Sequence, residues 1–231
     1  MEGAYSGKIF SSCDPINVDE GELTAVEFGV DEMRAAAEEA HNHGKGVAAH
    51  SVGTRAIRNA LDAGVDSIEH GIYLDEQLAE TMATQRTYLV PTISGYHEMT
   101  NTAWGWPSEF LELYARLKDA HLKSTTVAHK KGVKIAVGTD SNGDMVDEMK
   151  FLLKCGMSAM EVIVGATMNG ATLMGLEKNI GSVEPGKLAD LLVIDGDPLS
   201  DFEALRRIEV VVMGGELFSK SEFGKWNPCI E

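Results

Sequence analysis

The sequence of 231 residues is poor in cysteine and contains no long apolar run. Its cysteines, Cys13, Cys155 and Cys229, are odd in number and far apart, and no pair has metal-binding spacing. The N-terminal residues lack the apolar region of a secretory signal. No segment approaches the roughly 20 apolar residues that span a bilayer. We therefore expect a reduced, cytoplasmic protein without a membrane span.

Positive charge is also scarce. The chain has 20 Lys and Arg residues against 36 Asp and Glu residues, which gives a net charge of −16. Because phosphates would be repelled, this balance argues against a nucleic-acid or anionic-membrane partner. The hydrophobic content of 44% is sufficient for the core of one large domain or of a modest two-domain protein.

Short apolar runs alternate with helical patterns along most of the chain. The runs predict strands that end near residues Phe10, His50, His70, Thr92 and Asp140. This alternation predicts an α/β fold with about five βα units, a partial TIM-like (β/α) barrel, because a closed barrel needs eight. An open-sheet binding protein without a metal is the alternative. That fold usually carries a phosphate loop, and no Gly-x-Gly-x-x-Gly or Walker motif follows any predicted strand.

The pattern also predicts how the chain is divided. Helices are expected over residues 31–43, 54–63, 75–84, 108–131, 144–155, 158–168 and 169–175. Apolar runs at 189–194 and 208–213 predict strands outside the βα alternation, and therefore a small C-terminal β segment. We expect a partial barrel over 1–180, part of a small β-domain over 181–219, and a tail over 220–231.

Two neighbouring predicted strands end in a histidine, in Gly-Val-Ala-Ala-His50 and Ser-Ile-Glu-His70, and a later one ends in Asp140. In α/β barrels the C-terminal ends of the strands carry the active site. Two imidazoles and a carboxylate suit a borderline cation such as zinc. Such an ion lowers the pKa of a bound water, which can then attack a carbonyl carbon. Asp140 could carry the proton to the leaving amine.

Simpler interpretations of the same residues stay open on spacing alone. A histidine at a strand end is more often a hydrogen-bonded structural residue, and an aspartate in Gly-Thr-Asp140 can be a turn residue. The irregular segment 94–108 is either a functional loop or a packed surface lid. The histidines at no ligand-like spacing are interpreted as surface residues: His41, His43, His121 and His129.

Four motifs in combination resemble the amidohydrolase superfamily. They are Ala-Ala-His50, Ser-Ile-Glu-His70-Gly, Gly-Thr-Asp140, and Gly-Ser-Val-Glu-Pro-Gly-Lys-Leu-Ala-Asp-Leu at 181–191. The resemblance is to the imidazolonepropionase-like and Xaa-Pro dipeptidase-like branch, and it extends from about Gly3 to Phe218. It implies a barrel with one or two divalent metals at its C-terminal rim. It also implies hydrolysis of a C–N bond in a small molecule or dipeptide, such as an amide or cyclic amide, by metal-activated water.

The resemblance also implies roles for individual residues. His50 and His70 match the metal-binding histidines that end the family's fifth and sixth strands. Asp140 matches the acid of the eighth strand, which is both a ligand and the proton shuttle. Lys8 matches the fourth-strand lysine, which is carboxylated and bridges two metals. Tyr96 lies where relatives hold the substrate.

The family's first-strand His-x-His motif has no counterpart here, since His41-Asn42-His43 falls at a predicted helix end. The resemblance begins at the fourth strand. It leaves Lys8, His50 and His70 for one metal site and Lys8 and Asp140 for the other. We therefore expect the chain to oligomerise or to pair with a chain that supplies the missing strands. Activity of the chain alone stays open. The alternative is a non-catalytic metal-binding subunit or a truncated remnant of an amidohydrolase.

Overall fold

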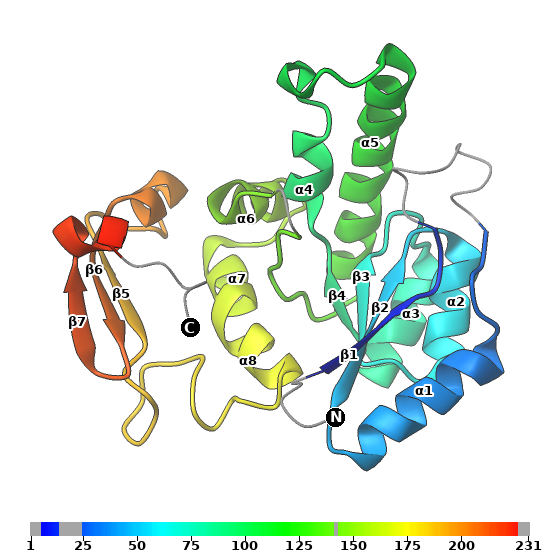
Figure 1. Cartoon of the computed structure of the whole chain (residues 1–231), viewed down its shortest axis with the longest axis horizontal. Coiled ribbons are helices and arrows are strands. Elements are labelled where there is room, and N and C mark those ends of the chain that lie inside the picture. Colours follow the sequence, from blue (N-terminus) through cyan, green and yellow to red (C-terminus); the bar gives the residue numbers. More distant parts are fainter. Residues whose placement is uncertain (1–5, 14–24, 141–142, 226–231) are drawn as a thin grey trace.

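The computed structural model describes residues 6–13, 25–140 and 143–225, and it contains two separate sheets. The first sheet is parallel, in the order β1 (Ser6–Phe10), β2 (Gly46–Ser51), β3 (Ser67–His70) and β4 (Tyr88–Val90). The second is antiparallel and consists of β5 (Leu191–Ile194), β6 (Ile208–Met213) and β7 (Glu216–Ser219). Helices lie between the two sheets (Figure 1).

Eight α-helices are present in the described part of the chain. They are α1 (Val30–Asn42), α2 (Thr54–Ala63), α3 (Glu76–Gln85), α4 (Ile93–Glu98), α5 (Ser108–Lys130), α6 (Met145–Lys154), α7 (Ala159–Val164) and α8 (Gly170–Leu173). A π-helical turn, Gly165–Asn169, joins α7 to α8. Short 3-10 helices cover Thr102–Trp104, Phe202–Arg206 (η5) and Lys220–Lys225. None of the helices in this part of the chain is both long and apolar enough to cross a membrane.

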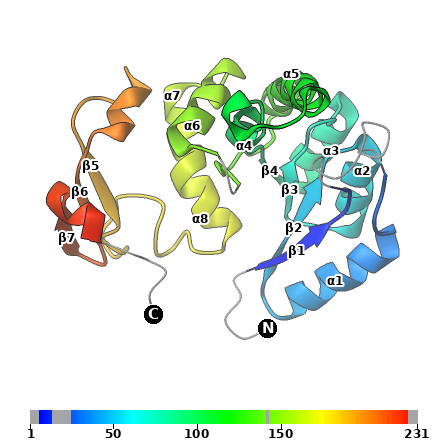
Figure 2. The ribbon, with the colours of Figure 1, turned by 45° about the horizontal axis from the view of Figure 1, so that its top comes forward.

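The predicted unit from β2 through α2 to β3 is confirmed. Helix α2 buries the face formed by Ala56, Ile57, Ala60 and Leu61. It ends at Gly64, which adopts the left-handed conformation (φ 84°) that glycine accepts without steric cost. Helices α1, α2 and α3 lie on one side of the parallel sheet, and α7 and α8 lie on the other (Figures 1 and 2).

The two faces of the parallel sheet carry different residues, because successive side chains of a strand point to opposite faces. One face packs on the helices through fully buried apolar residues such as Ala49, Ile68 and Leu89. On the other face, the register places Phe10 beside His50 and His50 beside Glu69. Lys8, His50 and Glu69 therefore lie on the face away from α1–α3.

The prediction of a fifth strand ending at Asp140 is wrong. Within 133–140, only Ile135 forms a bridge, to Leu89 of β4. On its other side this segment meets the π-helical turn. Val137 N–H donates to the Gly165 carbonyl (3.1 Å) and Asn169 Nδ2 donates to the Ile135 carbonyl (2.8 Å). A helix thus occupies the position of a neighbouring strand, so no ladder extends along the segment.

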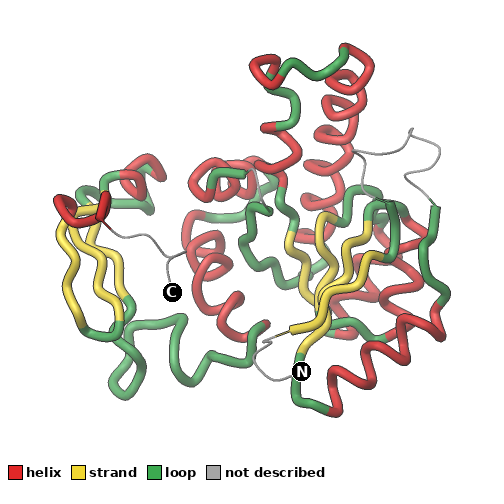
Figure 3. The backbone as a smooth tube through the Cα atoms, in the orientation of Figure 1, coloured by secondary structure: helices red, strands yellow, loops and turns green. Residues whose placement is uncertain are grey.

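Other boundaries differ less. Segment 94–108 is only partly irregular, because it contains most of α4 and the whole 3-10 helix Thr102–Trp104. Strand β7 was not predicted as a separate element. The expected tail begins with a 3-10 helix, and residues 1–5 and 226–231 lie outside the described part. A single loop leads from α8 to β5 (Figure 3). The domain boundary at residue 180 stays a prediction.

Candidate functional site

His50 and His70 meet at the C-terminal ends of neighbouring strands. Their ring centroids lie 4.5 Å apart in an edge-to-face arrangement. By strand alternation His70 would share the face of Ile68, but its backbone is left-handed (φ 70°). The next residue, Gly71, is also left-handed, and a Cβ there would lie 2.7 Å from Leu89 Cδ1. This strained turn accompanies the placement of the His70 ring against His50.

The surroundings of His70 favour a neutral imidazole. Its Nδ1 lies 2.7 Å from Thr92 Oγ1, and its buried Nε2 has no hydrogen-bond partner within the described residues. Burial, with smaller effects from His50, His121 and Lys8, holds the pKa of His70 well below its usual range. If Nδ1 donates to Thr92, Nε2 presents a lone pair of the kind that metal-binding histidines use.

Lys8 and Glu69 lie on the same face of the sheet. The Phe10 ring stacks on His50 with centroids 4.8 Å apart, and Lys8 Nζ lies 5.3 Å from the Phe10 centroid. Burial raises the pKa of Glu69, which the sequence analysis did not single out, while its bond from Ser67 Oγ (2.6 Å) lowers it. Lys8 and Asp140 also influence this pKa. In the sequence, the signal for Glu69 was its position two residues after Ser67 and directly before His70 in the motif Ser-Ile-Glu-His70.

Asp140 lies at the end of the segment beside β4. It is exposed and left-handed (φ 57°), and the two residues that follow it lie outside the described part of the chain. Among the described residues, no group of three or more His, Cys, Asp or Glu side chains is arranged to hold a metal ion. The structure thus brings His50 and His70 together but does not bring the Asp140 carboxylate into one cluster with them.

Tyr96 is buried on α4, and its ring packs edge-to-face on His70. Its ring centroid lies 5.3 Å from that of His70 and 5.4 Å from that of His121. The prediction that His121 is a surface residue is wrong, because it is fully buried. Burial lowers its pKa to about 4. The helical spacing of the buried positions Leu117, His121 and Ser124 on α5 was the signal for this burial.

A separate pocket of about 400 Å³ opens between α4 and α6. It is lined by Ser94, His97, Glu98, Trp104, Gly143, Asp144, Asp147 and Phe151. None of the predicted site residues lines it. The face of α4 that carries His97 packs on Phe151 of α6, whereas Tyr96 faces His70. Helix α4 therefore separates this pocket from the histidine pair.

The residues fit a divalent metal at the histidine pair. Two imidazoles in contact, one with a buried nitrogen that has no hydrogen-bond partner among the described residues, are suitable donors for a borderline cation. Lys8 has no oxygen of its own and would contribute a carboxylate only after carboxylation.

The sequence matches the model of the amidohydrolase family over residues 21–218. It is 31% identical to the ochratoxinase of Aspergillus niger over 232 aligned residues, which cover 97% of this chain and 48% of that protein. It is 32% identical to the imidazolonepropionase of Sphingopyxis alaskensis over 93 residues, which cover 37% of this chain and 23% of that protein. The chain spans about half the length of the curated relatives that it matches along most of its own length.

Solved structures give the same picture. A Xaa-Pro dipeptidase with bound methionine superposes with a TM-score of 0.86 at 33% identity, covering 94% of this chain and 55% of that one. The ochratoxinase of A. niger superposes with a TM-score of 0.85 at 29% identity, covering 99% and 54%. The described chain therefore has the fold of part of a (β/α) barrel.

Proposed function

The chain belongs to the amidohydrolase family, and from that premise we propose that it is the C-terminal part of a metal-dependent hydrolase of C–N bonds. One observation carries the proposal. The rings of His50 and His70 are in contact at adjacent strand ends, and His70 Nε2 is buried without a partner in the described residues. A buried polar atom without a partner costs free energy, and a bound ion would remove that cost.

In this proposal His50, His70 and a carboxylated Lys8 hold a divalent ion, zinc in our expectation. When bound, the ion supplies Lewis-acid activation of water and of the scissile carbonyl. Thr92 fixes the orientation of the His70 ring through the bond to Nδ1. Asp140 takes a proton from the attacking water and delivers it to the leaving nitrogen. Tyr96, packed against His70, limits the space in which the substrate lies.

The proposed substrate is a small amide, a cyclic amide or a dipeptide. Similar proteins are named as a Xaa-Pro dipeptidase, an ochratoxinase and an imidazolonepropionase. A cytoplasmic location stays part of the proposal.

We also propose that the active form includes strands from a second polypeptide or from further copies of the chain. On β1, the Phe10 side chain is 49% exposed, and within the described residues β1 pairs only with β2. An exposed strand edge that carries an apolar side chain favours association. A non-catalytic metal-binding subunit or truncated remnant is the second candidate, favoured by the absence of a third His, Cys, Asp or Glu ligand among the described residues.

The test compares the purified chain with His70→Ala and with His43→Ala, a matched control at an exposed histidine. We expect about one zinc ion per chain in the wild type and in His43→Ala, and loss of the metal in His70→Ala. Circular dichroism verifies that each variant is folded, and Thr92→Val provides a milder change at the same histidine. Absence of metal from the folded wild type contradicts both the hydrolase and the metal-binding subunit, and leaves only the truncated remnant.

Activity separates the two candidates. Hydrolysis of Xaa-Pro and N-acyl dipeptides and of cyclic amides is measured for the chain alone. It is also measured after addition of a polypeptide that corresponds to the unmatched half of a relative. Turnover that depends on His70 supports the hydrolase. Metal retention without turnover, both for the chain alone and after addition of the polypeptide, supports the non-catalytic subunit.

A further inference from the structure

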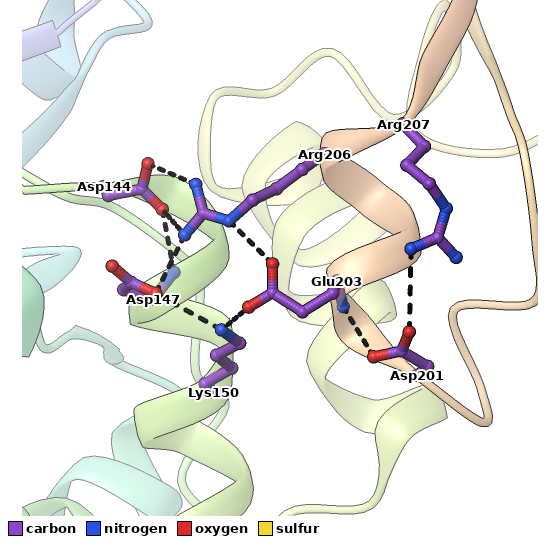
Figure 4. Close-up of polar contacts among 7 residues, drawn as sticks. All are labelled: Asp144, Asp147, Lys150, Asp201, Glu203, Arg206 and Arg207. Atoms are coloured by element: carbon purple, nitrogen blue, oxygen red, sulfur yellow. Dashed lines mark hydrogen bonds and ion pairs between the residues drawn. The ribbon is translucent and has the colours of Figure 1, made fainter.

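A polar network joins η5 to the first turn of α6 (Figure 4). The Arg206 guanidinium donates to both carboxylate oxygens of Asp144, at 2.7 and 2.8 Å, and to Asp147 at 2.8 Å. It also donates to Glu203 at 3.0 Å, and Glu203 in turn pairs with Lys150 of α6. Bidentate pairs within such a network have defined geometry, unlike isolated surface ion pairs.

The network acts on the start of α6. Asp144 is the N-cap of this helix and accepts a hydrogen bond from Asp147 N–H at 2.9 Å. Arg206 holds the pKa of Asp144 below its usual range, so the cap stays charged at the positive end of the helix dipole. Arg206 therefore binds both the N-cap and an acidic side chain of the first turn, and holds the start of α6 against η5.

The same first turn of α6 also holds α4. The Glu148 side chain is fully buried and accepts a hydrogen bond from Ser94 N–H, in the first turn of α4, at 2.6 Å. This contact joins residues 54 positions apart in the sequence. Tyr96 lies two residues beyond Ser94, so the placement of its ring depends on the contact with Glu148.

The first turn of α4 in turn packs on the backbone that carries Asp140. A Cβ at Gly95 would lie 2.8 Å from the Thr139 carbonyl oxygen and 3.6 Å from Asp140 Cβ. A Cβ at Gly143 would lie 2.4 Å from the same oxygen and 2.3 Å from Ser94 Oγ. Because these backbones touch without intervening side chains, a shift of α4 moves Thr139 and Asp140 as well.

We propose that Arg206 is a positioning residue that acts through α6 and α4 on the placement of Tyr96 and Asp140. The role of those two residues rests on the proposed function, whereas the mechanical coupling does not. The C-terminal β segment, which contributes Arg206 through η5, thereby controls one side of the candidate site.

Hydrogen–deuterium exchange of the full chain tests the coupling without any assay of activity. Arg206→Met is compared with Arg34→Met, whose arginine is similarly exposed and binds Asp31 and the Asp62 carbonyl on the far side of the molecule. In Arg206→Met we expect exchange to accelerate roughly threefold to tenfold in peptides 92–98 and 134–140, about the effect of a bidentate surface pair. Peptides of β2 and β3 should be unchanged, and Arg34→Met should leave 92–98 and 134–140 unchanged.

A second variant checks the route. Asp144→Asn keeps an N-cap acceptor but removes the charge that Arg206 binds. It should accelerate exchange in the same peptides. The double variant, Arg206→Met with Asp144→Asn, should exchange no faster there than either single variant. Acceleration confined to 143–154 and 202–206, or a response to Arg206→Met that Asp144→Asn does not share, overturns the proposal.

Metal content separates this inference from the proposed function. Both variants should bind as much zinc as the wild type, because neither residue contacts His50 or His70. In any mixture that hydrolyses substrate, kcat per bound metal should fall in both variants and stay unchanged in Arg34→Met. If the wild type binds no metal, the proposed function fails while the exchange result still stands.

Discussion

The histidine end and the aspartate end of the candidate site are positioned by different forces. His50 and His70 lie on β2 and β3, whose opposite face is buried against α1–α3. Asp140 ends a segment with one strand bridge, held by α4, the π-helical turn and contacts that lead to Arg206. The histidine end therefore depends mainly on apolar burial. The aspartate end, whose Val133 and Ile135 are buried in the same core, depends in addition on polar contacts and close backbone packing.

The largest expected effect tests the histidine end. Ile68 of β3 is fully buried, two residues before the turn at His70. We expect Ile68→Ala to lower the free energy of unfolding by about 2–5 kcal/mol through lost burial and a residual cavity. Denaturant unfolding measures the change, and Leu217→Ala, at a position 73% exposed, is the control. A loss as small as that of the control would show that apolar burial does not stabilise this end.

The next prediction concerns pH at the aspartate end. Burial raises the pKa of Glu148 from 4.5 to about 7, against the lowering effect of the Ser94 hydrogen bonds. Because the folded state binds this proton more tightly, the contribution of the group to stability is complete below pH 4.5 and is lost as pH rises toward 7. The wild type should therefore lose up to ~3 kcal/mol relative to Glu148→Gln over this interval.

Unfolding of both proteins between pH 4.5 and pH 8 measures this difference, and variation from other groups cancels in the comparison. If the free energies of unfolding of the two proteins changed in parallel with pH, Glu148 would be charged in the folded state over the whole interval. In that case it would hold Ser94 as a carboxylate, and burial would not oppose its ionisation.

The smallest expected effect is at Gly143. Since a Cβ there would meet three atoms at 2.8 Å or less, we expect Gly143→Ala to cost about 1–3 kcal/mol and to accelerate exchange in 92–98 and 134–140. Gly7→Ala is the matched control, because a Cβ on β1 would have only ordinary contacts at 3.9 Å or more. Equal stability and equal exchange rates in the two variants would show that close backbone packing at Gly143 does not hold the aspartate end.

The histidine end could be predicted from the sequence, and most of the aspartate end could not. Helix α2 was predicted over its observed range because its apolar spacing and Gly64 are local signals. The strand over 133–140 was wrongly predicted because an apolar run is also a local signal. Whether such a run forms a strand depends on the element beside it, and here that element is a helix that begins about 25 residues later. His121 was misplaced because residue type was given more weight than helical spacing.

The coupling residues carried no local signal at all. Glu148 and Arg206 each lie in a stretch that reads as an ordinary charged helix. Their roles arise from partners 54 and 62 positions away. Such contacts depend on tertiary structure, which residue spacing along one chain does not encode.

Because a helix lies beside segment 133–140, a further strand can pair with the parallel sheet only at its opposite edge. At segment 133–140, Val137 N–H and the Ile135 carbonyl are already bonded to the π-helical turn. At the other end, β1 has no second strand partner within the described residues. A polypeptide that extends this sheet, including an aggregating copy, must therefore add at β1. Charged substitutions at the exposed edge of that one strand would be the efficient way to keep the chain monodisperse at high concentration.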